Sequence, residues 1–212
     1  MRLHRILTCV AACLAATGLA TAGAAQERAP SSEARGPVIE TVDVDRFYAL
    51  YDAADGRPTA EQLQAYLDEG SEGLRNLARA RNVTGVRIAD AIAARPGMYV
   101  EARDCARMLP RVRARVTAAL ERFADLYPEA RFPPATFAIG RGKPIAIGSP
   151  VTGIQVGLEA LCASDFINPD MEDRFVRVLV HEYVHSQQAA ALTEKEGLTV
   201  LVVVHDLALA AA

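Results

Sequence analysis

Apolar residues recur at helical spacing through most of the chain between residues 40 and 130. Their positions lie three or four residues apart, as expected when one face of a helix packs on a core. Thr59 and Gln62 have capping-box spacing, Ser71 precedes the next apolar run, and Pro96-Gly97 is predicted to end a helix. Helices are therefore predicted over residues 43–53, 59–70, 71–78, 88–94 and 109–126.

The pattern changes after Phe132-Pro133-Pro134, where glycines separate short β-like runs. Residues 136–139, 145–147 and 154–156 predict two or three short strands joined by tight turns. Asn168-Pro169 is predicted to cap and begin a further helix. The fold class is therefore α+β and mainly helical, with a small antiparallel sheet preceding the last predicted helix.

The N-terminal pattern predicts export from the cytoplasm. A short basic start is followed by an apolar run from Ile6 to Ala20 and by small residues up to Ala25. This is typical of a secretory signal peptide over residues 1–25, cleaved near Ala24 or Ala25. The apolar run is shorter than the about 20 residues of a membrane span, so we expect none in the mature chain. A membrane anchor and lipidation at Cys13 are the alternatives.

Beyond the signal peptide, residues 26–37 are polar and predict a flexible leader. Residues 38–212 are long enough for one domain with a substantial core. The net charge of −3 argues against a nucleic-acid surface, since no basic excess is present to neutralise phosphates. Arg111, Arg113 and Arg115 are interpreted as a solvated helix face. The location is thus periplasmic or secreted, without a nucleic-acid partner.

Cysteine usage leaves two possibilities open. Removal of the signal peptide leaves Cys105 and Cys162. An even pair in an oxidising compartment suggests a disulfide. Two buried free thiols are the alternative, because spatial proximity cannot be read from the sequence.

Candidate chemistry lies in the pentad His181-Glu182-Tyr183-Val184-His185, an H-E-x-x-H motif. Histidines at i and i+4 on a helix share one face, so both can bind one zinc ion. The intervening Glu182 is then the general base that takes a proton from metal-bound water, and Tyr183 points away and packs. The surrounding helix is apolar on several sides, so burial would make these polar residues unfavourable unless paired or metal-bound. Hydrogen-bonded core histidines beside a surface glutamate are the alternative.

A catalytic zinc ion usually has three protein ligands. His205, which lies 20 residues after His185, is the favoured third ligand because imidazole binds zinc well. Glu194 and Glu196 are the alternatives, as is a chain without a third ligand. The predicted metal set is therefore His181, His185 and His205, with Zn²⁺ as cofactor.

Several segments besides the pentad resemble one family. They are Phe47-Tyr48, Gly70-Ser71-Glu72-Gly73-Leu74, Phe132-Pro133-Pro134, Ile139-Gly140-Arg141, Val156-Gly157-Leu158-Glu159 and the run from Val180 to Gln188. Together they are similar to a bacterial family of secreted, gluzincin-like zinc-dependent proteases, over most of residues 40–201. The resemblance implies a zincin-like fold and a peptide or protein substrate. It also implies that the strands at 136–156 supply an edge that pairs with extended substrate.

The resemblance ends near the C-terminus. In the family a following helix carries a Leu-x-x-x-Glu-Gly-like stretch whose glutamate completes the metal site. This chain matches only as far as Leu201 and then departs. We therefore expect a C-terminal truncation that weakens the metal site. The competing functional hypotheses are a catalytically inactive secreted binding or structural domain and a hydrolase acting on another substrate.

Overall fold

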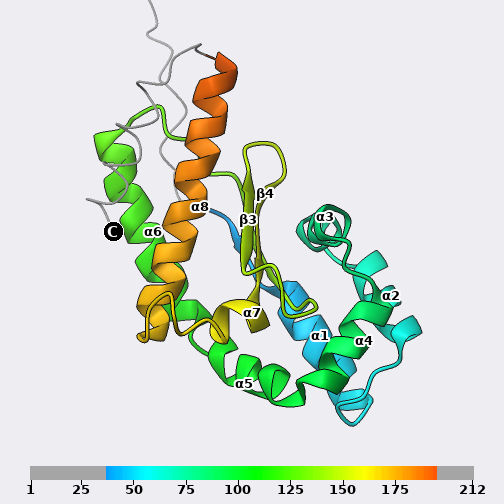
Figure 1. Ribbon diagram of the computed structural model, residues 1–212. Helices are drawn as coiled ribbons and strands as arrows, with labels where there is room; N and C mark the ends of the chain where they lie inside the picture. Colours follow the sequence, from blue (N-terminus) through cyan, green and yellow to red (C-terminus); the bar gives the residue numbers. More distant parts are fainter. Residues whose placement is uncertain (1–36, 195–212) are drawn as a thin grey trace, which may run out of the picture. The chain divides into compact units, whose positions relative to one another are not determined.

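The computed structural model describes residues 37–194, which form an α+β, mainly helical structure with one small sheet, as predicted (Figure 1). The predicted signal peptide, nearly all of the leader and the segment after Glu194 lie outside the described residues. The elements are β1 (Ile39–Glu40), α1 (Val42–Ala53), α2 (Ala60–Asp68), α3 (Glu72–Arg81), α4 (Gly85–Ala94), α5 (Pro96–Ala106), α6 (Leu109–Leu126), β2 (Ala135–Ala138), β3 (Ala146–Ser149), β4 (Gly153–Gly157), α7 (Leu158–Cys162) and α8 (Met171–Glu194).

Local signals placed several helix ends correctly. The predicted capping box is present: the Gln62 amide N–H donates to Thr59 Oγ1 at 3.3 Å, and the Thr59 N–H donates to Gln62 Oε1 at 2.8 Å. The Ser71 hydroxyl accepts from the Leu74 N–H at 3.2 Å and caps α3. These hydrogen bonds satisfy amide groups that have no partner inside the helix.

Three local predictions were wrong. Pro96 does not only end α4 but also occupies the first turn of α5, a position that suits proline because its missing N–H has no intrahelical partner. Helix α7 was not predicted, since five residues are too short for a periodic pattern. Helix α8 begins at Met171, two residues later than Asn168-Pro169 implied, because Asp170 Oδ1 accepts from the Asp173 N–H at 2.8 Å.

The sheet is mixed, which corrects the prediction of an antiparallel one. Its strand order is β1-β2-β4-β3. Strands β1, β2 and β4 run parallel, and only β3 runs antiparallel to its neighbour β4. After β2 the chain returns along the outside as β3 and turns tightly into β4, which inserts between β2 and β3. The predicted strand segments are confirmed, but their order depends on contacts that are distant in sequence.

Alternation along β2 shows which helices cover each face of the sheet. A Cβ atom on Gly73 of α3 would lie 2.0 Å from Thr136 Oγ1, so α3 packs closely on the side where Thr136 points. The next residue, Phe137, stacks on Phe175 of α8 with ring centroids 5.8 Å apart. Because successive strand residues point to opposite faces, α3 and α8 lie on opposite sides of the sheet (Figure 1).

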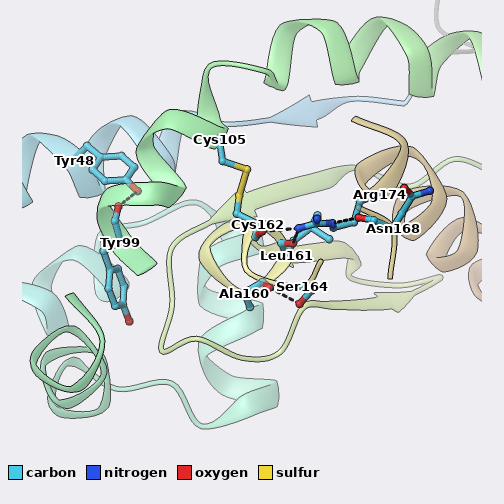
Figure 2. The surroundings of a disulfide bond; sticks show 9 residues. All are labelled: Tyr48, Tyr99, Cys105, Ala160, Leu161, Cys162, Ser164, Asn168 and Arg174. Atoms are coloured by element: carbon cyan, nitrogen blue, oxygen red, sulfur yellow. Dashed lines mark hydrogen bonds between the residues drawn. A yellow bond between two sulfur atoms is a disulfide. The ribbon is translucent and has the colours of Figure 1, made fainter. Parts of the chain in front are cut away.

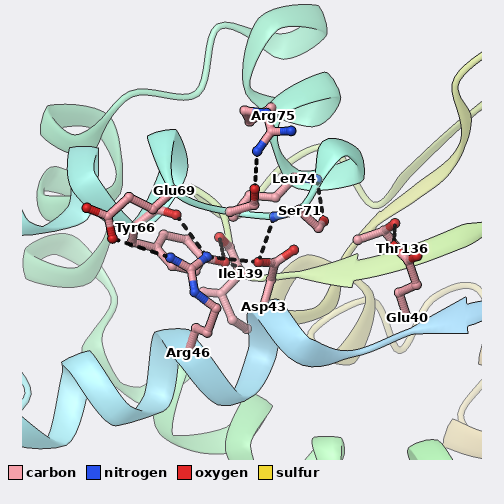
Figure 3. A network of polar contacts seen from close by, with 11 residues as sticks. Glu40, Asp43, Arg46, Tyr66, Glu69, Ser71, Leu74, Arg75, Thr136 and Ile139 are labelled. Carbon is pink, nitrogen blue, oxygen red and sulfur yellow. Dashed lines mark hydrogen bonds and ion pairs between the residues drawn. The ribbon is translucent and has the colours of Figure 1, made fainter.

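Buried polar contacts join α1 to the helices on the α3 side (Figure 3). Asp43, fully buried in the first turn of α1, accepts from the Arg46 guanidinium at 3.0 Å and from the Ser71 N–H at 3.1 Å. The Tyr66 hydroxyl donates to the Ile139 carbonyl and accepts from its N–H, both at 3.2 Å. These contacts join α1 to the start of α3, and α2 to the residue that follows β2.

The loop from β2 to β3 is held by Glu159, a fully buried residue of α7. Its Oε1 accepts from the Gly142 N–H at 2.8 Å, and the Gly140 N–H also donates to the carboxylate. Burial raises the pKa of Glu159, while the hydrogen bonds from Gly140 and Gly142 and the charge of Arg95 act in the opposite direction. The carboxylate therefore organises the loop that leads into β3.

Cys105 of α5 and Cys162 of α7 form a disulfide, with their Cα atoms 6.3 Å apart (Figure 2). The disulfide rules out the alternative of two free thiols. Beside it the buried Arg174 guanidinium donates to the Leu161 carbonyl at 3.2 Å, to the Cys162 carbonyl at 2.5 Å and to the Asn168 carbonyl at 2.8 Å. The beginning of α8 is thereby tied to the end of α7.

Helix α6 packs along α8 (Figure 1). The Arg111 guanidinium donates to Glu172 at 2.5 Å, and Arg115 forms ion pairs with Glu172 and Asp173. All three arginines are exposed, as the interpretation of a solvated helix face predicted, and Arg111 and Arg115 in addition pair with the acidic first turn of α8. No helix within residues 37–194 has the length and apolar character needed to cross a membrane.

Candidate active site

Helix α8 has one side buried against the core and another side exposed. Phe175, Leu179 and Tyr183 are fully buried along the side that faces the core. The Tyr183 hydroxyl donates to the Pro133 carbonyl at 3.0 Å. The prediction that Tyr183 packs, away from the histidines, is therefore confirmed, and its hydrogen bond fixes the rotation of α8 about its axis.

The two histidines of the pentad meet on the exposed side of α8. Nε2 of His181 lies 2.9 Å from Nε2 of His185, and the ring centroids are 4.4 Å apart with the rings almost perpendicular. The i, i+4 spacing thus brings both nitrogens to one point, as predicted. Both side chains are exposed. The argument that burial makes these imidazoles unfavourable was therefore wrong, because only part of α8 is enclosed by the sheet and α6.

This pair fits two positions of a tetrahedral zinc site. With zinc–nitrogen bonds of about 2.0–2.1 Å, two ligand nitrogens in such a site are about 3.3 Å apart. The observed 2.9 Å is slightly shorter and suits a hydrogen bond between the rings. A small rotation of either exposed ring opens the pair to the distance that zinc requires. The donor set, two imidazole nitrogens converging from one helical turn, is therefore compatible with the metal.

Glu182 leaves this face and lies against the edge strand β3. A Cβ atom built on Gly148 would lie 2.8 Å from Glu182 Oε2 and 3.0 Å from the Glu182 carbonyl oxygen. A side chain at position 148 would require the Glu182 carboxylate or the α8 backbone to shift. The half-buried Glu182 carboxylate is thereby held between the histidine pair and the sheet edge.

The backbone of β3 explains this contact. The Gly157 N–H of β4 donates to the Ile145 carbonyl at 2.9 Å, so every second residue from Ile145 faces β4. Ala146 and Gly148 therefore direct their N–H and C=O groups away from β4, toward the open edge. The Gly148 N–H is used by the Glu182 carboxylate. Part of an edge that pairs with no other strand of residues 37–194 thus lies directly beside the candidate base.

Burial raises the pKa of Glu182 above its ordinary value. The charges of His185 and Arg81 and the hydrogen bond from the Gly148 backbone act in the opposite direction and are weaker. A carboxylate with a raised pKa is a stronger base than a solvated one. The environment of Glu182 therefore suits a group that must accept a proton.

The third predicted ligand is not among these side chains. His205 and Glu196 lie outside the described residues, and of Glu194 only the backbone is described, at the end of α8. Within residues 37–194 no three His, Cys, Asp or Glu side chains gather as a metal-binding group. The described part of the chain therefore brings together His181, His185 and Glu182 and leaves the prediction for His205 open.

Sequence reasoning missed two residues of the site. Gln188 Oε1 lies 3.0 Å from His185 Nδ1, one helical turn after the second histidine. Its i+3 position could have identified it, because such residues are neighbours on a helix surface. Gly148 could not have been found, since nothing in the sequence relates it to Glu182, 34 residues later.

Comparisons with models of protein families, with curated proteins and with solved structures found no match to this chain. What the molecule does must therefore be argued from the chemistry of the site.

Proposed function

We propose that this chain is an exported zinc-dependent metallopeptidase with its metal centre on α8. The convergence of His181 Nε2 and His185 Nε2, 2.9 Å apart beside Glu182 and the β3 edge, is the observation that supports it. The Cys105–Cys162 disulfide supports the exported location, because such bonds persist in oxidising compartments. The arrangement of an antiparallel edge strand beside an H-E-x-x-H helix supports a zincin-like fold.

In this proposal His181 and His185 hold the zinc ion, and His205 is the third ligand. A zinc ion held there would polarise the scissile carbonyl and lower the pKa of a bound water toward about 7. Glu182 would act as the general base and then as the general acid toward the leaving amine. Its position between the histidines and β3 suits both proton transfers.

The proposed substrate is a peptide in extended conformation. Ala146 directs its N–H and C=O groups away from β4, and Gly148 its C=O group, and an extended chain can bind to such an edge through main-chain hydrogen bonds. A peptide bound there runs past Glu182, which contacts Gly148. The strand edge therefore supports a peptide substrate.

The test combines zinc titration by calorimetry with hydrolysis of a fluorescently labelled unfolded protein, using the full chain. Glu182→Gln is expected to lower hydrolysis by about 10²- to 10⁴-fold while zinc affinity changes little, because the general base is lost and the ligands remain. His181→Ala and His185→Ala should abolish zinc binding, and His205→Ala should weaken it.

Three results would count against the proposal or one of its parts. If His205→Ala binds zinc as tightly as wild type, the third ligand must be sought at Glu194 or Glu196. A wild-type chain that neither binds zinc nor hydrolyses the labelled protein would favour the inactive binding or structural domain. Full activity of Glu182→Gln would contradict the assigned base directly.

A further inference from the structure

Gln188 contacts the histidine pair from outside the pentad. Its side-chain oxygen Oε1 lies 3.0 Å from Nδ1 of His185, on the exposed side of α8. An amide oxygen can only accept a hydrogen bond, so Nδ1 must carry the proton in this contact. A neutral imidazole has a single N–H, and Nε2 of His185 is then left with a free lone pair.

We propose that Gln188 is a positioning residue that holds His185 in the tautomer protonated at Nδ1. This is the form in which Nε2 can bind a metal ion. The inference rests on the proposed zinc site, since it assigns to Gln188 the task of preparing one ligand before the metal arrives. Hydrogen bonds of this kind to the distal nitrogen orient the ring and raise its basicity as a ligand.

The same contact makes the two histidines unequal. Their Nε2 atoms are 2.9 Å apart, and with both rings neutral a hydrogen bond at this distance needs one proton between them. Because Nε2 of His185 lacks a proton, Nε2 of His181 must donate it. His185 is therefore ready to bind zinc, whereas His181 has to move its proton to Nδ1 before it can do so.

The neighbouring Gln187 provides a matched control. Its side chain is buried; Oε1 accepts from the Arg131 N–H at 2.8 Å, and the amide nitrogen donates to the Arg131 and Tyr183 carbonyls. Gln187 thus fastens the segment before β2 to α8 and takes no part in the contact with His185. Substitutions at the two adjacent glutamines separate loss of helix packing from loss of the tautomer.

The deciding measurement is a long-range ¹H–¹⁵N correlation spectrum of the histidine rings in the metal-free full chain, at a pH where imidazole is neutral. Single histidine substitutions assign the signals of the four histidines. We expect His185 to be protonated at Nδ1 and His181 at Nε2. Gln188→Met should shift His185 toward the Nε2-protonated form, whereas Gln188→Glu and Gln187→Met should leave its tautomer unchanged.

Zinc titration gives a second readout. Gln188→Met should weaken zinc binding by about 10- to 100-fold, and Gln188→Glu should restore the wild-type affinity because it keeps an acceptor. A His185 ring protonated at Nε2 in the wild type, or an unchanged ring in Gln188→Met, would overturn the inference. A wild-type chain that binds no zinc would overturn the proposed function alone, since the metal-free spectrum decides the tautomer independently.

Discussion

At the scale of single residues, the site depends on Gly148, a residue without a side chain. Gly148 lets β3 approach Glu182 so closely that a Cβ atom at this position would lie 2.8 Å from Oε2. The Gly148 N–H meanwhile donates to the Glu182 carboxylate. One residue thereby sets both the position of the candidate base and the distance between strand and helix.

Gly148→Ala should therefore reduce hydrolysis at least about tenfold, because displacement of a catalytic group by a fraction of an ångström already slows the chemistry. Zinc affinity should stay close to wild type, since the histidines lie on another side of α8. Kinetics and calorimetry on the same preparation measure both effects.

Gly97→Ala is the matched control for this substitution. A Cβ atom on Gly97 of α5 meets no atom within 4 Å. Alanine favours a helix by about 1 kcal/mol over glycine, so this variant should unfold at a slightly higher temperature and hydrolyse normally. Unchanged hydrolysis in Gly148→Ala would show that the close contact with Glu182 is not needed.

At the scale of elements, α8 is held at its beginning and left open around its histidines. Arg174 ties the first turn of α8 to α7, and the disulfide ties α7 to α5 (Figure 2). The ion pairs with Arg111 and Arg115 add a contact to α6. These long-range links keep the orientation of a helix whose functional side is exposed.

Reduction of the disulfide, or the double substitution Cys105→Ser with Cys162→Ser, should destabilise the chain. The bond joins residues 57 positions apart. Closing a loop of this length lowers the conformational entropy of the unfolded chain and stabilises the fold by about 4 kcal/mol. Loss of the bond should therefore lower the melting temperature by about 10 °C. Thermal unfolding with and without reductant measures this, and the double variant should not respond to reductant. Equal melting temperatures of all four samples would contradict the assigned pairing.

At the scale of the whole molecule, the core contains two carboxylates that are fully buried, Asp43 and Glu159. Asp43 is paired with Arg46. Glu159 has only backbone N–H donors around Oε1, and its Oε2 has no hydrogen-bond partner in the described part of the chain. Its burial raises its pKa, so the folded chain holds the Glu159 proton more tightly than the unfolded chain does.

The sign of the pH effect follows from this difference. The contribution of Glu159 to stability is fully present below its ordinary pKa of 4.5, falls as pH rises toward the raised value and then stays constant. Glu159→Gln cannot ionise, so its stability relative to wild type should increase with pH through that window. Urea unfolding of both proteins at a series of pH values measures it. A difference that does not change with pH would contradict the raised pKa.

Local patterns predicted much of the secondary structure. Helix α6 coincides with the predicted residues 109–126, and the capping residues Thr59 and Ser71 begin their helices as expected. These features depend on side chains only a few positions apart. Helix α5 was missed, because Pro96-Gly97 was interpreted only as the end of a helix. Helix α7 and the two-residue strand β1 were missed too, because such short segments are stabilised by partners distant in sequence.

The spacing of the pentad by itself determined that His181 and His185 share a side of one helix, because four residues make about one helical turn. Only the tertiary structure decided what surrounds them. It exposes both histidines, brings Cys105 to Cys162 and places Gly148 against Glu182. Contacts within one turn follow from local backbone geometry, whereas the meeting of β3 and α8 requires the whole sheet to assemble in the order β1-β2-β4-β3.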